Sequence, residues 1–225
     1  MKQTLTLRKL GLVEYQPSYE AMSRFTSERG TETDDEIWCL QHPPVYTLGL
    51  AGKHEHILDA GKIPVLNTDR GGQVTYHGPG QLLIYLLLDL RRRKIGIKDY
   101  VYFLEQSLIE YLASLGLSAG RRLGAPGVYV DGRKIAALGI RVRKGCCYHG
   151  LALNINMDTS PFKGINPCGY TDLEVVQLSE FGICLTMDEV CDGLIKFLLI
   201  NLGAEHYSVI SKQSLTDLNE NFAAA

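Results

Sequence analysis

Apolar residues recur with the period of an amphipathic helix in two parts of the chain. Across residues 98–116 they stand three or four positions apart, and Gly116 suits the end of that helix. The other part follows a capping box from Thr186 to Glu189 and reaches Gly203. A third helix is predicted over about residues 17–28, because the proline at its start is tolerated in a first turn.

Strand-length apolar runs fill the intervals between these helices. They lie at residues 4–13, 36–41, 45–48, 63–66, 74–76, 81–88, 128–130, 134–142 and 148–155. Asp131-Gly132 leaves two residues between two of these runs, which is the signal for a type I′ hairpin. Because the strands come in runs and do not alternate strictly with helices, we predict an α+β fold with a mixed or antiparallel sheet.

The composition narrows the class of protein. Apolar residues make up 45% of the 225 residues and the net charge is -2, which suits one globular domain and argues against a nucleic-acid or membrane-surface binder. The first residues lack the apolar core of a secretory signal, and no apolar run reaches the roughly 18 residues of a membrane span. Since the six cysteines include no CxxC pair, we expect reduced thiols and a cytoplasmic location.

Cys168 stands in a context that a structural cysteine rarely occupies. Its neighbours are Pro167 and Gly169, so neither a helix nor a sheet ladder is expected there. A thiol on such a tight turn is accessible, and nearby backbone N–H groups can point at an oxyanion. Because an ordinary thiol has a pKa of about 8.5 and is mostly protonated at neutral pH, a nucleophilic role for Cys168 requires a helper.

The other cysteines carry weaker signals. Cys146, Cys147 and His149 suggest a metal site, but their spacing is not that of a zinc site and no second ligand pair follows. In a strand, Cys147 and His149 are expected on one face, with Cys146 on the other. The remaining three are predicted to fill the core: Cys39, Cys184 and Cys191.

Lys134 is the candidate helper. It follows the hairpin turn and shares a strand face with Ala136 and Leu138, although a lysine near a turn is usually solvated. Small residues gather on its strand and the next one, at Ala136, Ala137, Gly139, Gly150 and Ala152. Such residues are poor strand formers and mark the close approach of a ligand or another backbone. We therefore expect a groove with a floor of small residues, suited to an alkyl chain.

Residues 70–81 form a second shaped segment. Five of the twelve are glycine or proline; Arg70 offers a bidentate donor, and Gln73, Thr75 and His77 alternate onto one face. A phosphate-binding loop is the alternative, but neither GxxxxGK[ST] nor GxGxxG is present. By itself the segment predicts a polar loop beside a sheet.

Together these segments resemble the octanoyltransferases of lipoate biosynthesis. The matching stretches, in chain order, are HPPVYTLG at 42–49, RGGQVTYHGPGQL at 70–82, GVYVDGRKIAALGIRV at 127–142, YHGLALNI at 148–155 and INPCGY at 165–170. The resemblance spans about residues 5–205, which makes it more specific than any single motif. It implies one acyltransferase catalytic domain over 1–225, with a tail at about 212–225. The implied fold is that of biotin and lipoate protein ligase catalytic domains, an α+β fold with a mixed, largely antiparallel sheet and flanking helices.

The resemblance also implies the chemistry. Cys168 would carry the acyl thioester and Lys134 would lower the pKa of its thiol. Octanoyl-acyl carrier protein would be the donor, and lipoyl domains of 2-oxoacid dehydrogenase complexes and the glycine-cleavage H protein the acceptors. No ATP or metal would be needed, because the phosphopantetheine belongs to the carrier protein and one thioester replaces another. The implied substrate contacts are Arg70, Gly71, Gly72, Gln73, Val74, Thr75, Tyr76, His77, Ala137, Leu138, Gly139, Gly150, Leu151 and Ala152.

Three other functions remain open at this point. An ATP-dependent lipoate or biotin ligase of the same fold would activate a free acid and need no cysteine nucleophile. A thiol hydrolase would pair Cys168 with His77 or His149 and release free acid. A non-catalytic acyl-binding module would leave Cys168 with an ordinary thiol pKa.

Overall fold

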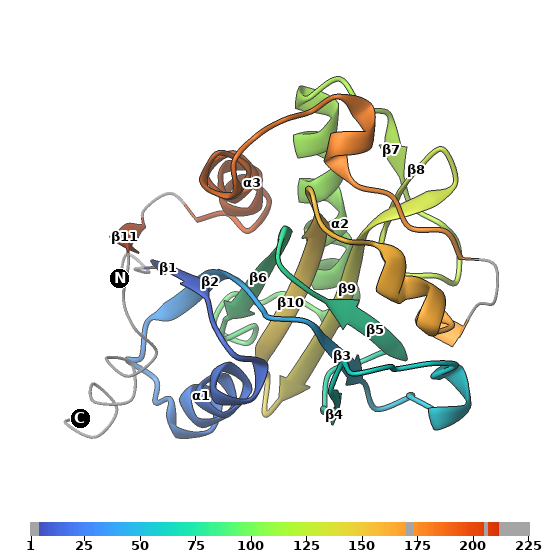
Figure 1. Ribbon diagram of the computed structural model, residues 1–225. Helices are drawn as coiled ribbons and strands as arrows, with labels where there is room; N and C mark the ends of the chain where they lie inside the picture. The colour runs from blue at the N-terminus through green and yellow to red at the C-terminus, as the bar shows by residue number, and fades with distance from the viewer. Residues whose placement is uncertain (1–4, 170–172, 205–206, 212–225) are drawn as a thin grey trace.

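A computed structural model describes residues 5–169, 173–204 and 207–211. Its main sheet has eight strands in the order β11-β1-β2-β6-β10-β9-β8-β7 (Figure 1). The strands are β1 (Leu5–Leu12), β2 (Asp35–Gln41), β6 (Gln81–Leu87), β7 (Ala119–Gly120), β8 (Val128–Val130), β9 (Arg133–Arg143), β10 (Cys146–Asn154) and β11 (Ser208–Ser211). The helices within these residues are α1 (Tyr15–Glu28), α2 (Ile97–Ser114) and α3 (Met187–Asn201).

The predicted fold class is confirmed. β1 pairs in parallel with both β2 and β11, and every other neighbouring pair in the main sheet is antiparallel. The sheet is therefore mixed and largely antiparallel. Asp131 and Gly132 both have positive φ, as the predicted type I′ turn requires.

A second, three-stranded sheet was not predicted. It consists of β3 (Val45–Leu48) between β4 (Val65–Asn67) and β5 (Val74–His77). These strands were expected individually, but Pro43 and Pro44 interrupt the chain after β2, and proline cannot donate to a ladder. The N–H of Gly71 donates to Ile140 O at 2.9 Å, so the small sheet and its loop are held against β9.

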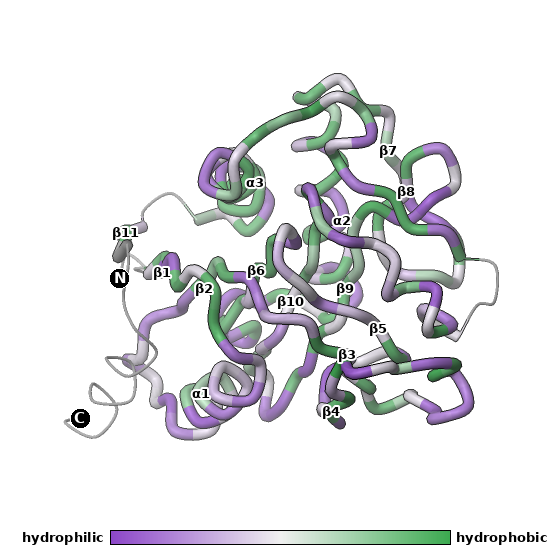
Figure 2. Tube along the Cα trace, in the orientation of Figure 1, coloured by the Kyte–Doolittle hydropathy of each residue, from purple (hydrophilic) through white to green (hydrophobic). Residues whose placement is uncertain are grey.

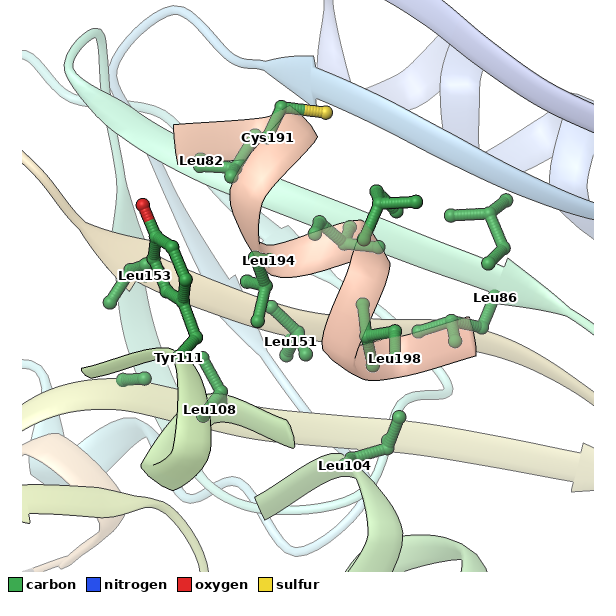
Figure 3. Packing of buried hydrophobic residues seen from close by; sticks show 14 of the residues in the cluster. Leu82, Leu86, Leu104, Leu108, Tyr111, Leu151, Leu153, Cys191, Leu194 and Leu198 are labelled. Carbon is green, nitrogen blue, oxygen red and sulfur yellow. The ribbon is translucent and has the colours of Figure 1, made fainter. Parts of the chain in front are cut away.

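Both faces of the main sheet are covered. α2 and α3 lie on one face, where leucines of both helices meet leucines of β6 and β10 (Figure 3). α1 covers part of the other face with Met22 and Phe25, which pack in the same cluster as Trp38. Hydrophobic and hydrophilic residues alternate along α1 and α3, as expected for helices with one buried side (Figure 2).

The predicted helices are confirmed, with shifts of a few residues at their ends. α1 begins at Tyr15, which places Pro17 inside its first turn. The capping box of α3 has both hydrogen bonds: Thr186 Oγ1 accepts from the Glu189 N–H at 3.3 Å, and the Glu189 carboxylate accepts from the Thr186 N–H at 2.8 Å. The short edge strands β7 and β11 were not predicted. The predicted tail, about 212–225, lies outside the described residues.

Short 3-10 helices lie in the connections between these elements. They are η1 (His54–His56), η2 (Ser160–Gly164), η3 (Pro167–Gly169) and η4 (Leu178–Phe181). Cys39 and Cys191 are buried as predicted, but the prediction for Cys184 was wrong, because it is exposed just before the cap of α3.

We expect the buried Asp35 to be the most sensitive charged position of the scaffold. Its carboxylate accepts from Arg29 at 2.6 Å, Arg92 at 2.7 Å and Arg93 at 2.7 Å, and it is almost completely buried. Asp35→Asn leaves these guanidinium groups without their counter-charge and should cost about 3–5 kcal/mol of unfolding free energy in a urea titration.

The matched control is Glu55→Gln, which removes the carboxylate of an exposed pair with Lys53. Its unfolding free energy should stay within about 0.5 kcal/mol of the wild type. Equal losses for the two variants would contradict the role assigned to Asp35.

Candidate active site

The Pro-Cys-Gly segment forms the tight turn that the sequence predicted. η3 contains Pro167, Cys168 and Gly169, and the N–H of Gly169 donates to Asn166 O at 3.0 Å. Gly169 has φ +79°, a value that favours glycine. The N–H of Asn166 donates to His56 O at 2.8 Å, which fixes the turn to η1. The Cys168 side chain and Tyr170 of the same motif lie outside the described part of the chain.

Lys134 is buried, unlike an ordinary lysine near a turn. It lies at the start of β9 with 4% of its surface exposed, and its ammonium donates to Pro126 O at 3.1 Å. The ammonium also lies 5.3 Å from the centre of the Tyr129 ring. Its backbone is bonded to the segment that follows Cys168, through the carbonyl of Glu174 and the N–H of Val176. The lysine is therefore fixed at both its backbone and its ammonium.

Gln73 connects the turn of Cys168 to the cavity that contains Lys134. A Cβ placed on Gly169 would lie 3.6 Å from Gln73 Cγ, so the turn packs against this side chain. Gln73 and Lys134 both line one cavity, together with Pro126 and Gly139. Gln73 thus contacts the turn and also lines the cavity of Lys134. The contact between the Cys168 sulfur and the Lys134 ammonium stays a prediction.

A second cavity has the expected floor of small residues; we call it the trench. Ala137 of β9 lies opposite Ala152 of β10, and Gly139 lies beside them. The trench meets the lysine cavity at the four residues that line both: Gly72, Gln73, Leu138 and Gly139.

The His149 side chain lies on a different face of β10 from the one predicted. It has φ +58°, and it packs against Tyr19 of α1 and Tyr85, whereas Cys147 is buried among the residues under α2 and α3. The prediction that Cys147 and His149 share a face was therefore wrong. At Gly150 a Cβ would lie 2.1 Å from Ile84 O, so the residue after this reversal has to be glycine. Only backbone occupies the trench floor there.

Arg70 shapes the loop that contains Gly72 and Gln73, which line the trench; we call this loop the roof of the trench. Its guanidinium donates to the carbonyls of Thr47 at 2.6 Å, Gly71 at 2.9 Å and Gln73 at 2.7 Å. The donors that the sequence suggested for a substrate are thus directed at the protein's own backbone. Arg70 fixes the loop that contributes Gly72 and Gln73 to both cavities.

A chain of hydrogen bonds runs from Arg70 through the neighbouring polar groups. Arg70 donates to Thr47 Oγ1, which lies 3.3 Å from His77 Nε2, and His77 Nδ1 lies 2.7 Å from Gln81 Oε1. The Gln81 amide then donates to Asn154 Oδ1 at 2.9 Å, and the Asn154 amide donates to Val176 O at 3.0 Å. Since Gln81 Oε1 is an acceptor, His77 carries a proton on Nδ1. Thr47 Oγ1 already accepts twice from Arg70, at 3.0 and 2.9 Å, so its hydroxyl donates to His77 Nε2 and the imidazole is neutral.

Burial keeps the histidines around the trench neutral. It lowers the pKa of His77 to about 3, with the neighbouring His42 adding to the effect, and lowers the pKa of His42 to about 4. Burial also lowers the pKa of His149, although Asp69 opposes this shift by accepting from its Nε2 at 3.1 Å. Burial alone would raise the pKa of Asp69, but hydrogen bonds from His149 and Tyr148 hold it below its ordinary value.

Almost all of the predicted substrate contacts lie at one of the two cavities. The exception is Tyr76, which alternates away from Thr75 and His77 and packs with Phe162 under the small sheet. Sequence reasoning missed Tyr15, Leu83 and Tyr85, which also line the trench. No motif marks them, because Leu83 and Tyr85 lie in the continuous apolar run of β6.

Within the described ranges, no group of three or more His, Cys, Asp or Glu side chains is placed to hold a metal ion. The same part of the chain contains no helix long and apolar enough to cross a membrane.

Comparisons with known proteins agree with the geometry. Residues 14–199 match the family described as lipoyl protein ligase A/B catalytic domain. The chain is 58% identical to an octanoyltransferase of Dechloromonas aromatica over 89% of this chain and 98% of that one. It is 57% identical to an octanoyltransferase of Azoarcus sp. over 87% and 86% of the two chains.

A solved structure of lipoate-protein ligase A bound with ATP is similar in fold. It has a TM-score of 0.78 at 17% identity and covers 99% of this chain and 95% of its own. At this identity the likeness concerns the fold alone. It confirms the predicted fold of the lipoate ligase catalytic domain.

The buried histidines predict a loss of stability in mild acid. His42 and His77 stay neutral in the folded protein, while in the unfolded chain they take up a proton below a pKa of about 6.5. Their contribution is therefore complete above about pH 6.5 and is lost as the pH falls toward their folded pKa values of about 4 and about 3. Between about pH 7 and pH 5.5, the unfolding free energy should fall by roughly 1 kcal/mol for each histidine.

Chemical denaturation of His42→Gln tests this assignment, because the variant should lose roughly 1 kcal/mol of the fall in unfolding free energy between about pH 7 and pH 5.5. The control is His54→Gln, at an exposed position in η1, which should keep the wild-type slope. An unchanged slope in His42→Gln would contradict the assignment.

Proposed function

Because the chain belongs to the lipoyl protein ligase A/B catalytic domain family, we propose that it is an octanoyltransferase that works through a thioester on Cys168. It would take the octanoyl group from acyl carrier protein and pass it to a lysine of a lipoyl domain. The 58% identity to an octanoyltransferase across nearly the whole chain supports the reaction. The observation that supports the mechanism is the buried Lys134, at a cavity lined by Gln73, whose side chain lies beside Gly169 of the Cys168 turn.

The first half of the proposed reaction exchanges one thioester for another. The Cys168 thiolate attacks the carbonyl carbon of the donor thioester, and the bond from that carbon to the phosphopantetheine sulfur breaks. The released thiolate would take up one proton from the Lys134 ammonium, which leaves Lys134 neutral. Backbone N–H groups near Cys168 and Gly139 would stabilise the oxyanion of the tetrahedral intermediate. Since a thioester is consumed and a thioester is formed, the step requires no ATP.

Lys134 would supply the charge that makes the thiolate available. A cation within about 4–6 Å of a thiol favours the ionised form and lowers the thiol pKa. Lowering that pKa by about two units would raise the thiolate fraction at neutral pH more than tenfold. The contact of the Lys134 ammonium with Pro126 O holds the charge in place before a substrate binds.

The second half transfers the acyl group to an amine. The acceptor lysine first loses one proton to water, and its neutral amine attacks the thioester. Lys134, neutral after the first half, would accept the second proton, which the nitrogen loses as the amide forms. The new amide bond forms, the bond to the Cys168 sulfur breaks, and the departing thiolate remains beside the protonated Lys134. Lys134 thus gives up one proton in the first half and regains one in the second.

The two cavities suit the two kinds of group that must meet. The trench has a floor of Ala and Gly residues, which suits the alkyl chain. The cavity of Lys134 would admit the thiol of the donor arm and then the amine of the acceptor. The residues common to both cavities mark where the reacting carbonyl would lie.

A ligase that consumes ATP is the alternative, because a protein of similar fold is bound with ATP. A Pro-Cys-Gly turn and a buried lysine that both contact or share a cavity with Gln73 favour thioester exchange, since adenylate chemistry needs no cysteine. We therefore propose that neither a nucleotide nor a metal ion takes part. The proposed carrier-protein donor and the reduced thiols also favour a cytoplasmic location.

Mass spectrometry of the intact protein tests the thioester. Incubation with octanoyl-carrier protein, without ATP, should add one octanoyl group to the wild type and none to Cys168→Ser, with acceptor octanoylation falling roughly 10³-fold or more. Lys134→Met should slow adduct formation by at least about tenfold, because fewer thiols are ionised. Cys184→Ser and Lys98→Met, both at exposed positions, are the matched controls and should behave like the wild type.

The same assay separates the alternatives. Transfer that persists in Cys168→Ser and requires ATP would identify a ligase. Release of octanoic acid without an acceptor would identify a hydrolase. Either result would overturn the proposal.

A further inference from the structure

The trench ends at β6, where the side chains become large. Across the sheet, Ala137 of β9 lies opposite Ala152 of β10, and Ala152 lies opposite Leu83 of β6. Leu83 in turn lies opposite Leu40 of β2. Two strands of small residues are thus followed by two strands of bulky ones on the same face. Leu83 and Tyr85 both line the trench, so together they form its end wall.

The end wall is rigid. Leu83 is buried in the same cluster as Leu40 and Trp38, which leaves it no room to move back. The Tyr85 hydroxyl lies 2.7 Å from His42 Nε2, and His42 Nδ1 lies 2.6 Å from Val13 O. Because a carbonyl can only accept, His42 carries its proton on Nδ1 and accepts from the Tyr85 hydroxyl on Nε2. The ring of Tyr85 is therefore fixed at its far end.

The open end of the trench lies at β9. Gly139 lines the trench there, and Gln73, against which the turn of Cys168 packs, lines both cavities. From β9 across β10 to β6 the distance is two strand spacings, about 10 Å. An extended eight-carbon acyl chain has about this length. A longer chain would have to displace Leu83 or Tyr85, and a shorter one would leave the end of the trench empty.

We propose that Leu83 and Tyr85 determine the length of the acyl group that this protein transfers, with the alanines of β9 and β10 setting the depth of the trench. The inference rests on the proposed thioester at Cys168 and extends it to specificity. In a hydrophobic pocket, one methylene group changes relative rates by roughly 10–200-fold. Changing the wall by one or two carbon lengths should therefore shift the preferred chain length measurably.

A competition experiment measures this preference. The protein is mixed with equal amounts of hexanoyl-, octanoyl-, decanoyl- and dodecanoyl-carrier protein, and the initial adducts on Cys168 are counted by intact mass. Leu83→Ala shortens the wall and should raise the decanoyl-to-octanoyl ratio at least about tenfold over the wild type. Ala137→Val raises the floor at a half-buried position and should raise the hexanoyl-to-octanoyl ratio by a similar factor.

Leu87→Ala is the matched control, because Leu87 lies on the same strand and in the same buried cluster as Leu83 but does not line the trench. It should keep the wild-type ratios. Circular dichroism checks that each variant is folded, and Ala137→Val tests the inference even where Leu83→Ala does not fold.

The inference and the proposed function fail in different ways. If the adducts form but both variants keep the wild-type ratios within about twofold, the end wall does not set chain length and the inference is overturned. Equal shifts in Leu87→Ala and Leu83→Ala would also overturn it, because they would reflect general loosening. If the wild type forms no adduct with any donor, the proposed thioester itself is wrong.

Discussion

The neutral imidazole of His77 is the interaction on which the rest of the site depends. It accepts from Thr47, which in turn accepts from Arg70, and it donates to Gln81. Gln81 continues the chain through Asn154 to the carbonyl of Val176. The N–H of Val176 donates to the carbonyl of Lys134. The roof of the trench and the backbone of the buried lysine therefore belong to one hydrogen-bonded chain. A second proton on His77 would face Thr47 Oγ1, which already accepts twice from Arg70, and would break the chain there. Burial prevents this by keeping the pKa of His77 at about 3.

This chain explains how an ammonium can be placed inside the protein. Burying a cation is costly unless it is hydrogen-bonded and close to compensating charge. Lys134 has the carbonyl of Pro126 and the face of Tyr129 as partners, and its backbone is fixed on both sides. A cation that is held in this way favours any anion that forms within about 4–6 Å of it. Burial thus fixes the position of the charge on which the proposed chemistry depends.

The sequence was sufficient where local patterns decide the structure. The period of α2, the capping box at Thr186 and the turn at Asp131 all depend on neighbours in the chain, and all are confirmed. It failed where distant segments decide. His149 turns to the opposite face because of a positive φ that alternation does not foresee, and Ile84 O on the next strand requires glycine at 150. The floor of small residues on β9 and β10 could be predicted from the sequence, because Gly and Ala are poor strand formers. The residues that end the trench could not, because Leu83 and Tyr85 resemble any other core strand position until the sheet register is known.

Register is therefore the link between fold and specificity. The antiparallel pairing of β9, β10 and β6 puts two strands of small residues beside one of large residues, and a shift of one position would move every side chain to the other face. The depth of the trench is set by side chains, but its length is set by the number of strands that it crosses. Strand spacing is fixed by backbone hydrogen bonds and hardly varies between proteins. The number of strands that the trench crosses therefore sets the length of the acyl chain in steps of one strand spacing. The side chain of Leu83, at the end of the trench, makes the finer adjustment. Leu40 and Trp38 pack in the same cluster as Leu83 and hold it in place. The length of the trench therefore stays fixed when a flexible alkyl chain enters it.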